Sequence, residues 1–230
     1  MLKYSTETYL KEILANSTYW LVLALLLGAE YFAVTQYKGN LAFVEVLQFI
    51  VIPVYIFLVA VPFFTEDRVL TFELVMFRDW LTVPLARMLS LLASLLPFLL
   101  TTVGIAWGMG ERSFALPILA STLFYASLVL LITVFGGGGK VYVLSMGALF
   151  MLPFSSLVLI QNQASMGNTV GGLIGYLTYV MSPVYGLHVH HSGVLAISIS
   201  AGNDVTFLIS ALWMVSYLLV SQVRNVRPSG

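Results

Sequence analysis

The stretch Ala86–Met109, ARMLSLLASLLPFLLTTVGIAWGM, decides the fold class of this chain. It carries one charge, Arg87, close to its start, and its remaining residues are apolar, small or hydroxyl-bearing. A helix that crosses a lipid bilayer needs about 20 mostly apolar residues, and this stretch is long enough to do so. We therefore expect a transmembrane α-helix here, and similar apolar stretches lie on both sides of it.

The composition of the whole chain points to the same class. Of the 230 residues, 60% are hydrophobic and only 9% are charged, whereas a soluble domain has roughly 25% charged residues. A soluble fold of this size could not cover so much apolar surface, so the excess is expected to face lipid. The formal net charge is +0, and this balance gives no hint of the clustered basic surface that nucleic-acid binding needs. The chain has no cysteine, which excludes thiolate catalysis, disulfides and Cys-ligated metals.

Six apolar stretches are long enough to be spans, so we predict an all-α integral membrane protein with six transmembrane helices. We treat residues 1–230 as a single transmembrane domain, because the sequence shows no internal repeat and no soluble insertion. The predicted spans are Tyr19–Gln36, Leu41–Phe64, Ala86–Met109, Phe114–Phe135, Val141–Ile160 and Val205–Val220.

The region between the fifth and sixth spans is interpreted as an external re-entrant hairpin, residues 171–203. It contains two apolar pieces, Leu173–Met181 and Gly193–Ser200, which are separated by Pro183 and a histidine cluster. Each piece is too short to cross a bilayer, as is typical of re-entrant or interfacial helices. A single broken span over Leu173–Ile199 is the alternative.

The distribution of basic residues favours six spans over seven. With six spans, both termini share one side with eight of the ten Lys and Arg residues, and two lie on the other side. Cytoplasmic segments carry the excess of Lys and Arg, so we expect both termini to be cytoplasmic in the plasma membrane. The eight are Lys3, Lys11, Arg68, Arg78, Arg87, Lys140, Arg224 and Arg227, and the two are Lys38 and Arg112.

Two segments on the cytoplasmic side have amphipathic patterns. One is the N-terminal segment 1–18, in which charges alternate with apolar residues. The other is the segment 66–83, EDRVLTFELVMFRDWLTV, between the second and third spans. At 100° per residue its polar arc faces away from an apolar arc rich in Leu, Phe and Trp, which predicts an interfacial helix. It is either a solvated connector or a coupling helix that contacts a soluble partner.

The segment Glu66–Arg87 resembles the cytoplasmic loop of ABC-2-type transporter permeases. That loop has an acidic and basic pair, then a run similar to Gly-Thr-x-Glu-Leu, then a proline and a basic residue that enter the third span. The matching residues here are Asp67-Arg68, Thr71–Leu74 and Pro84–Arg87. Leu70 stands at the position of the family's glycine, and the segment between Glu73 and Pro84 is longer than in the family.

The resemblance implies the membrane subunit of an ABC exporter. Such a subunit pairs with a second permease copy or a homologous permease, lies among membrane lipid, and binds a separate ABC ATPase through the coupling helix. The coupling residues that the resemblance implies are Asp67, Arg68, Thr71, Glu73, Arg78 and Asp79.

We expect no catalytic, cofactor or metal site on this chain, and therefore no enzyme activity of its own. The run Gly136–Lys140 is similar to a phosphate-binding loop, but such a loop has Gly, four residues, Gly-Lys and then Ser or Thr. Here Val141 follows Lys140, and Val134 stands where the first glycine would be. ATP hydrolysis is therefore expected in a partner subunit.

A few polar residues lie in or beside apolar stretches. Glu30 and Glu45 fall in the outer halves of the first two spans, and charged groups at membrane depth tend to be paired or to line a pathway. An interfacial ion pair with Lys38 is one interpretation, and a transport pathway is the other. The external histidines are His188, His190 and His191; a polar cap on the hairpin and a metal or haem site are both open for them.

The alternative function is a membrane anchor or cofactor-bearing subunit of a respiratory or electron-transfer complex. Such subunits use histidines within their spans as haem ligands. All three histidines of this chain lie in one segment outside the predicted spans, which favours the permease. The transported substrate is not indicated by any motif.

The six-span topology can be checked with cysteine labelling, since the chain has no cysteine of its own. A thiol introduced by Ser229→Cys should react with a membrane-impermeant maleimide only after the cells are opened. A thiol introduced by Ser113→Cys, in the short loop after the third span, should react in intact cells. External labelling of the Ser229→Cys variant would contradict the six-span arrangement.

Overall fold

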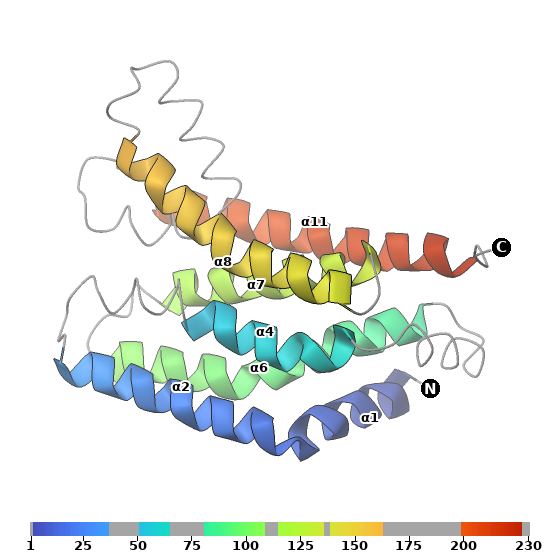
Figure 1. The fold of residues 1–230 in the computed structure, drawn as a ribbon, viewed down its shortest axis with the longest axis horizontal. Coiled ribbons are helices and arrows are strands. Elements are labelled where there is room, and N and C mark those ends of the chain that lie inside the picture. The colour runs from blue at the N-terminus through green and yellow to red at the C-terminus, as the bar shows by residue number, and fades with distance from the viewer. Residues whose placement is uncertain are drawn as a thin grey trace.

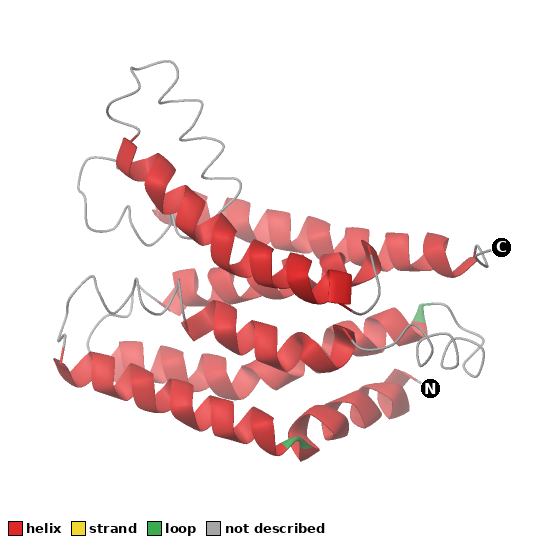
Figure 2. Ribbon diagram, viewed as in Figure 1, coloured by secondary structure: helices red, strands yellow, loops and turns green. Residues whose placement is uncertain are grey.

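The computed structural model describes residues 2–36, 51–64, 81–108, 115–135, 139–162 and 199–226. These residues are almost entirely helical and contain no strand (Figure 2), so the predicted all-α class is confirmed for them. The helices are α1 (Leu2–Ala15), α2 (Ser17–Gln36), α4 (Ile52–Phe64), α6 (Thr82–Gly108), α7 (Ala115–Phe135), α8 (Gly139–Asn162) and α11 (Ile199–Val226).

The helices from α2 to α11 run in alternating directions along one bundle (Figure 1). Helices α2, α6 and α8 run away from the end of the bundle at which α1 starts, and α4, α7 and α11 run back toward it. Helix α4 contacts α2, α6, α7 and α8, and α7 packs against α11. The start of α1 and the end of α11 therefore lie at the same end of the bundle.

Each predicted span has a described helix in the corresponding place. The pairs are Tyr19–Gln36 with α2, the described part of Leu41–Phe64 with α4, Ala86–Met109 with α6, Phe114–Phe135 with α7, Val141–Ile160 with α8 and Val205–Val220 with α11. Helix α11 starts at Ile199, before the predicted span. Residues 199–203, predicted from the sequence as part of the hairpin 171–203, are therefore helical and continuous with the helix of the last predicted span.

Length and apolarity single out one described helix that could cross a membrane, α6. The pair Ser5–Ala15 and Ser17–Phe32 also meets these criteria when taken together, although it is bent by 66°. Three further apolar stretches, Ile118–Val134, Gly139–Met151 and Thr206–Gln222, are shorter.

The described helices expose large apolar side chains and bury small hydroxyl residues. On α2 the exposed set includes Trp20, Leu21 and Leu25, and on α11 it includes Leu208 and Leu212. The buried polar residues are mostly Ser and Thr at helix contacts: Ser90, Ser94, Thr102, Ser121, Thr122, Ser127, Ser145, Thr206, Ser210 and Ser221. Small residues of this kind let helix backbones approach closely.

An elbow at Asn16 joins α1 to α2. The Asn16 side-chain oxygen Oδ1 accepts a hydrogen bond from the Thr18 backbone N–H at 3.0 Å, which caps the start of α2. The Trp20 indole N–H donates to the Leu14 carbonyl at 2.7 Å and so satisfies one of the last carbonyls of α1. These two side chains bridge the break on both sides and fix the bend between the helices.

Helix α1 confirms the amphipathic pattern of segment 1–18 within residues 2–15. Its buried residues are Ser5, Tyr9 and Ile13, which are spaced by four and share one face. Its Lys and Glu residues are exposed: Lys3, Glu7, Lys11 and Glu12. The apolar face of α1 packs against α6.

The segments 66–80 and 171–198 lie outside the described residues. The predicted coupling residues and the external histidines fall within them.

The cap at the elbow can be tested by substitution of Asn16. Asn16→Ala should lower the free energy of unfolding by about 1 kcal/mol, the usual cost of losing a helix N-cap. Asn16→Asp keeps the side-chain acceptor and places a negative charge at the start of α2, so it should retain the stability of the native protein. Thermal unfolding of the detergent-solubilised protein measures both, and equal losses in the two variants would contradict a capping role.

Candidate functional site

Glu30 is a carboxylate inside the helix bundle. It lies on α2, and only 1% of its surface is exposed. The Thr102 hydroxyl, on α6, lies 2.8 Å from Glu30 Oε1 and 3.1 Å from Oε2, and donates to the carboxylate. Helices α2 and α6 run in the same direction, and Glu30 and Thr102 each lie in the second half of their helix. We call this contact the Glu30–Thr102 pair.

The Glu30–Thr102 pair shows that Glu30 is buried among the described helices, while the expected ion pair with Lys38 involves a residue outside the described part of the chain. Burial removes the carboxylate from water, and a buried polar group must find its partner within the protein. Lys38 and Glu45, which the sequence places nearby, lie outside the described residues. Because such a group is costly inside an apolar bundle, Glu30 is the strongest candidate for a functional residue among those described.

A second polar contact joins three helices around one backbone carbonyl. The hydroxyls of Tyr19 on α2 and Tyr55 on α4 each donate to the Ser94 carbonyl of α6 at 2.9 Å. The two hydroxyl oxygens are 3.2 Å apart. Tyr55 is the donor in this contact, so its single hydrogen is shared between the Tyr19 hydroxyl and the Ser94 carbonyl. This tyrosine pair ties α2 and α4 to the same turn of α6.

The turn of α6 that carries Ser94 also holds the bulk of the local core. Tyr55 is fully buried and stacks on Phe98, with ring centroids 4.4 Å apart. Pro97 lies inside α6 and has no N–H for the Ala93 carbonyl, so this turn lacks one backbone hydrogen bond. The polar contacts of the tyrosine pair therefore meet α6 in the turn that Pro97 leaves one backbone hydrogen bond short.

The first turns of α6 are attached to α1. The Arg87 Nε donates to the Tyr9 hydroxyl at 3.3 Å, and its guanidinium carbon lies 5.4 Å from the centre of the Tyr9 ring. The Ser90 hydroxyl has one hydrogen; it lies 2.7 Å from the Ala86 carbonyl of its own helix and 3.1 Å from the Thr6 carbonyl of α1. The contacts of Arg87 and Ser90 with α1 join it to the start of α6, so these two segments are expected to move together.

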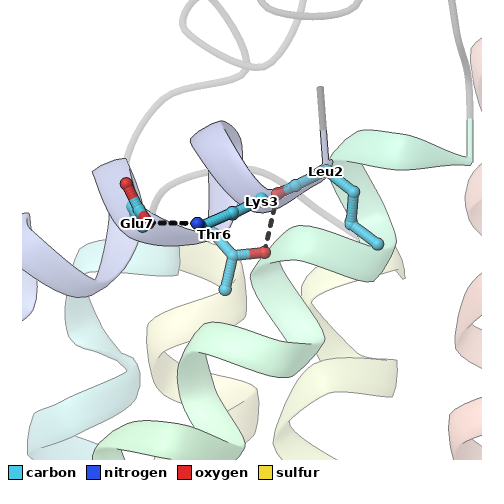
Figure 3. A network of polar contacts seen from close by, with 4 residues as sticks. All are labelled: Leu2, Lys3, Thr6 and Glu7. Carbon is cyan, nitrogen blue, oxygen red and sulfur yellow. Dashed lines mark hydrogen bonds and ion pairs between the residues drawn. The ribbon is translucent and has the colours of Figure 1, made fainter.

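Helix α1 also carries polar contacts within itself, shown in Figure 3. The Thr6 hydroxyl donates to the Leu2 carbonyl at 2.9 Å, and Lys3 and Glu7 form an i,i+4 ion pair at 4.0 Å. An exposed pair of this kind contributes about 0.3–0.5 kcal/mol. These contacts support the helix itself and do not form a site.

A cavity of about 220 Å³ lies at the inner side of the elbow, between α1, α2 and α4. Asn16 and Thr18 stand at its exposed rim. Its other lining residues are apolar or aromatic: Ile13, Tyr19, Val22, Tyr55, Leu58 and Val59. The hydroxyls of the tyrosine pair are engaged with Ser94, so the rings of these tyrosines supply the wall.

The described residues contain no cluster of three or more His, Asp or Glu side chains that could hold a metal ion. The external histidines, Glu45 and the coupling residues lie outside the described part of the chain. Of the site residues expected from the sequence, the structure therefore places Glu30 alone.

Three residues of these contacts were not expected from the sequence: Thr102, Tyr19 and Tyr55. The sequence did hold a signal for Thr102. Glu30 lies in the outer half of the first predicted span and Thr102 in the outer half of the third. Odd-numbered spans run in the same direction, so the two residues could be expected at a similar depth. No spacing in the sequence pairs Tyr19 with Tyr55, because their contact depends on how α2 and α4 pack on α6.

Comparisons with protein-family models, with curated proteins and with solved structures find no match to this chain. The functional argument therefore depends on the chain's own residues and contacts. A buried carboxylate, a carbonyl shared by two tyrosines and an apolar cavity can bind, position or transmit movement.

Thr102→Val should lower the free energy of unfolding by about 1–3 kcal/mol, because it leaves the buried Glu30 carboxylate without this partner. Thr102→Ser keeps the hydroxyl and should cost less. In a Glu30→Leu background, Thr102→Val should have little effect, since the acceptor is already gone. Denaturant titration in detergent gives the free energy of unfolding of the native protein and of each variant. An equal cost of Thr102→Val in both backgrounds would rule out the pairing.

Proposed function

We propose that this chain is a six-span permease subunit of an ABC-2-type exporter, located in the plasma membrane with both termini in the cytoplasm. It would dimerise, and it would couple ATP hydrolysis by a separate ATPase to the export of a substrate. The steps of this proposal are membrane placement, orientation, and coupling.

Membrane placement is supported by the outer surface of the described helices. Large apolar side chains are exposed on α2, α6, α8 and α11, including Leu25, Leu100, Val143 and Leu212. In water, apolar patches on this scale mark interaction sites or aggregation liabilities; against lipid they are the expected surface. The buried Ser and Thr residues at helix contacts are typical of membrane bundles.

Orientation is supported by where the described basic residues fall. Lys3 and Lys11 are in α1, Arg87 is in the second turn of α6, Lys140 is in the first turn of α8, and Arg224 is near the end of α11. All of these segments lie at the end of the bundle where α1 starts (Figure 1). A one-sided excess of Lys and Arg marks the cytoplasmic side.

Coupling is the step that the resemblance of Glu66–Arg87 contributes. The last residue of the matched segment, Arg87, is the residue that contacts Tyr9 of α1, and this contact is the observation that carries the proposal. A push on the segment 66–83 would reach the start of α6, pass to α1 through Arg87 and Ser90, and reach α2 through the elbow. Tilting of packed helices in this way is an established means of switching access.

The exporter proposal is tested by purification of the tagged chain from its own membranes. An ABC-type ATPase should co-purify, and Asp67→Arg or Arg78→Glu should reduce both its association and its stimulated activity. Loss of one contact charge should cost about 1–3 kcal/mol where the charge is buried at the interface. Membrane insertion should be unchanged, because these residues lie outside the predicted spans.

Lys140→Glu is the matched control, since it reverses an exposed charge on the same predicted side but outside the coupling segment. It should leave ATPase association intact. If both loop variants associate and stimulate as the native protein does, the segment 66–83 is a connector and the coupling role is refuted.

A further inference from the structure

The cavity at the elbow has the chemistry of a site for one aliphatic chain. Its walls come from Ile13, Val22, Leu58 and Val59 together with the rings of the tyrosine pair. A buried water needs 2–4 polar partners, and the hydroxyls of Tyr19 and Tyr55 already donate to the Ser94 carbonyl. The cavity is open at its rim, and its volume of about 220 Å³ has room for part of an apolar ligand.

The polar groups of the cavity lie at its rim and not within it. Asn16 and Thr18 are exposed there, while Tyr55 is fully buried. A ligand that fits this gradient has an apolar chain inside and a polar group outside. That is the shape of a single chain of an amphiphile, entering with its end first.

The position of the cavity identifies the source of such a chain. The elbow joins the amphipathic α1, whose charged face is exposed, to the apolar α2. Trp20 lies beside the rim and is 51% exposed, and tryptophan is enriched at the level of lipid headgroups. On the proposed membrane placement, the rim therefore faces the boundary between headgroups and acyl chains in the cytoplasmic leaflet.

We propose that the cavity between α1, α2 and α4 binds one acyl chain of a bilayer phospholipid, with the headgroup near Asn16 and Thr18. This inference rests on the proposed membrane placement but not on the exporter activity. The chain fills the angle between α1 and α2 and thereby helps to hold the elbow at its observed bend. It is a resident lipid, and its site is separate from the Glu30–Thr102 pair.

The test is photocrosslinking in vesicles of phosphatidylcholine that contain a phosphatidylcholine with a diazirine on its acyl chain. After irradiation, digestion and mass spectrometry should find adducts on Leu58 or Val59, although Val59 is buried. Adducts should also form on the exposed residues Leu100 and Leu212, which report general contact with lipid. Val59→Trp fills the cavity. It should abolish the cavity adducts, on α4 and α1, and leave those on Leu100 and Leu212.

Val215→Trp is the matched control, because it makes the same change on the exposed face of α11 and should leave the cavity adducts in place. Val22→Phe is a second filling variant, to be used if Val59→Trp does not fold. Adducts on Leu100 and Leu212 with none in the cavity overturn this inference and leave the membrane placement intact. Cavity adducts that persist in a filling variant that folds also overturn it. An absence of adducts everywhere refutes the membrane placement as well.

Discussion

The need to pair polar groups inside an apolar bundle governs the arrangement of these helices. A polar group that is buried without a partner costs about 1–3 kcal/mol, and helices with apolar outer faces offer few partners. Glu30 therefore binds Thr102 on a neighbouring helix, and the Ser94 carbonyl takes the hydroxyls of two tyrosines. Among the described residues, the buried Tyr125 hydroxyl and the Ser145 hydroxyl oxygen have no such partner. Hydrogen bonding in the described bundle is therefore incomplete at these two hydroxyls.

Helix α6 collects most of these contacts and so acts as the reference element of the fold. Its first turns hold α1 through Arg87 and Ser90, its middle holds the tyrosine pair, and its second half holds Glu30. Pro97 lies between the last two of these attachments and weakens the helix there. A movement of the first turns can therefore be transmitted to α1 without an equal movement at Thr102.

The sequence was sufficient to predict the helices but not the contacts between them. Apolar stretches of about 20 residues located the described helices α2, α4, α6, α7, α8 and α11, because this signal lies within one segment. The buried state of Glu30 and the meeting of Tyr19 with Tyr55 depend on packing between segments 36 or more residues apart, which no local pattern contains. The elbow is intermediate: Asn16 followed by a long apolar run indicates a helix start, but the bend of 66° and the Trp20–Leu14 bond across it are not contained in that pattern.

The bond between the Trp20 indole and the Leu14 carbonyl has an optical consequence. The ring is half exposed, and its N–H is held at 2.7 Å by a residue on the other side of the bend. Straightening the elbow would separate these two groups and change the polarity around the indole. The emission of Trp20 would then follow the angle between α1 and α2, so a variant that keeps Trp20 and replaces the other three tryptophans would carry a native fluorophore that senses this hinge.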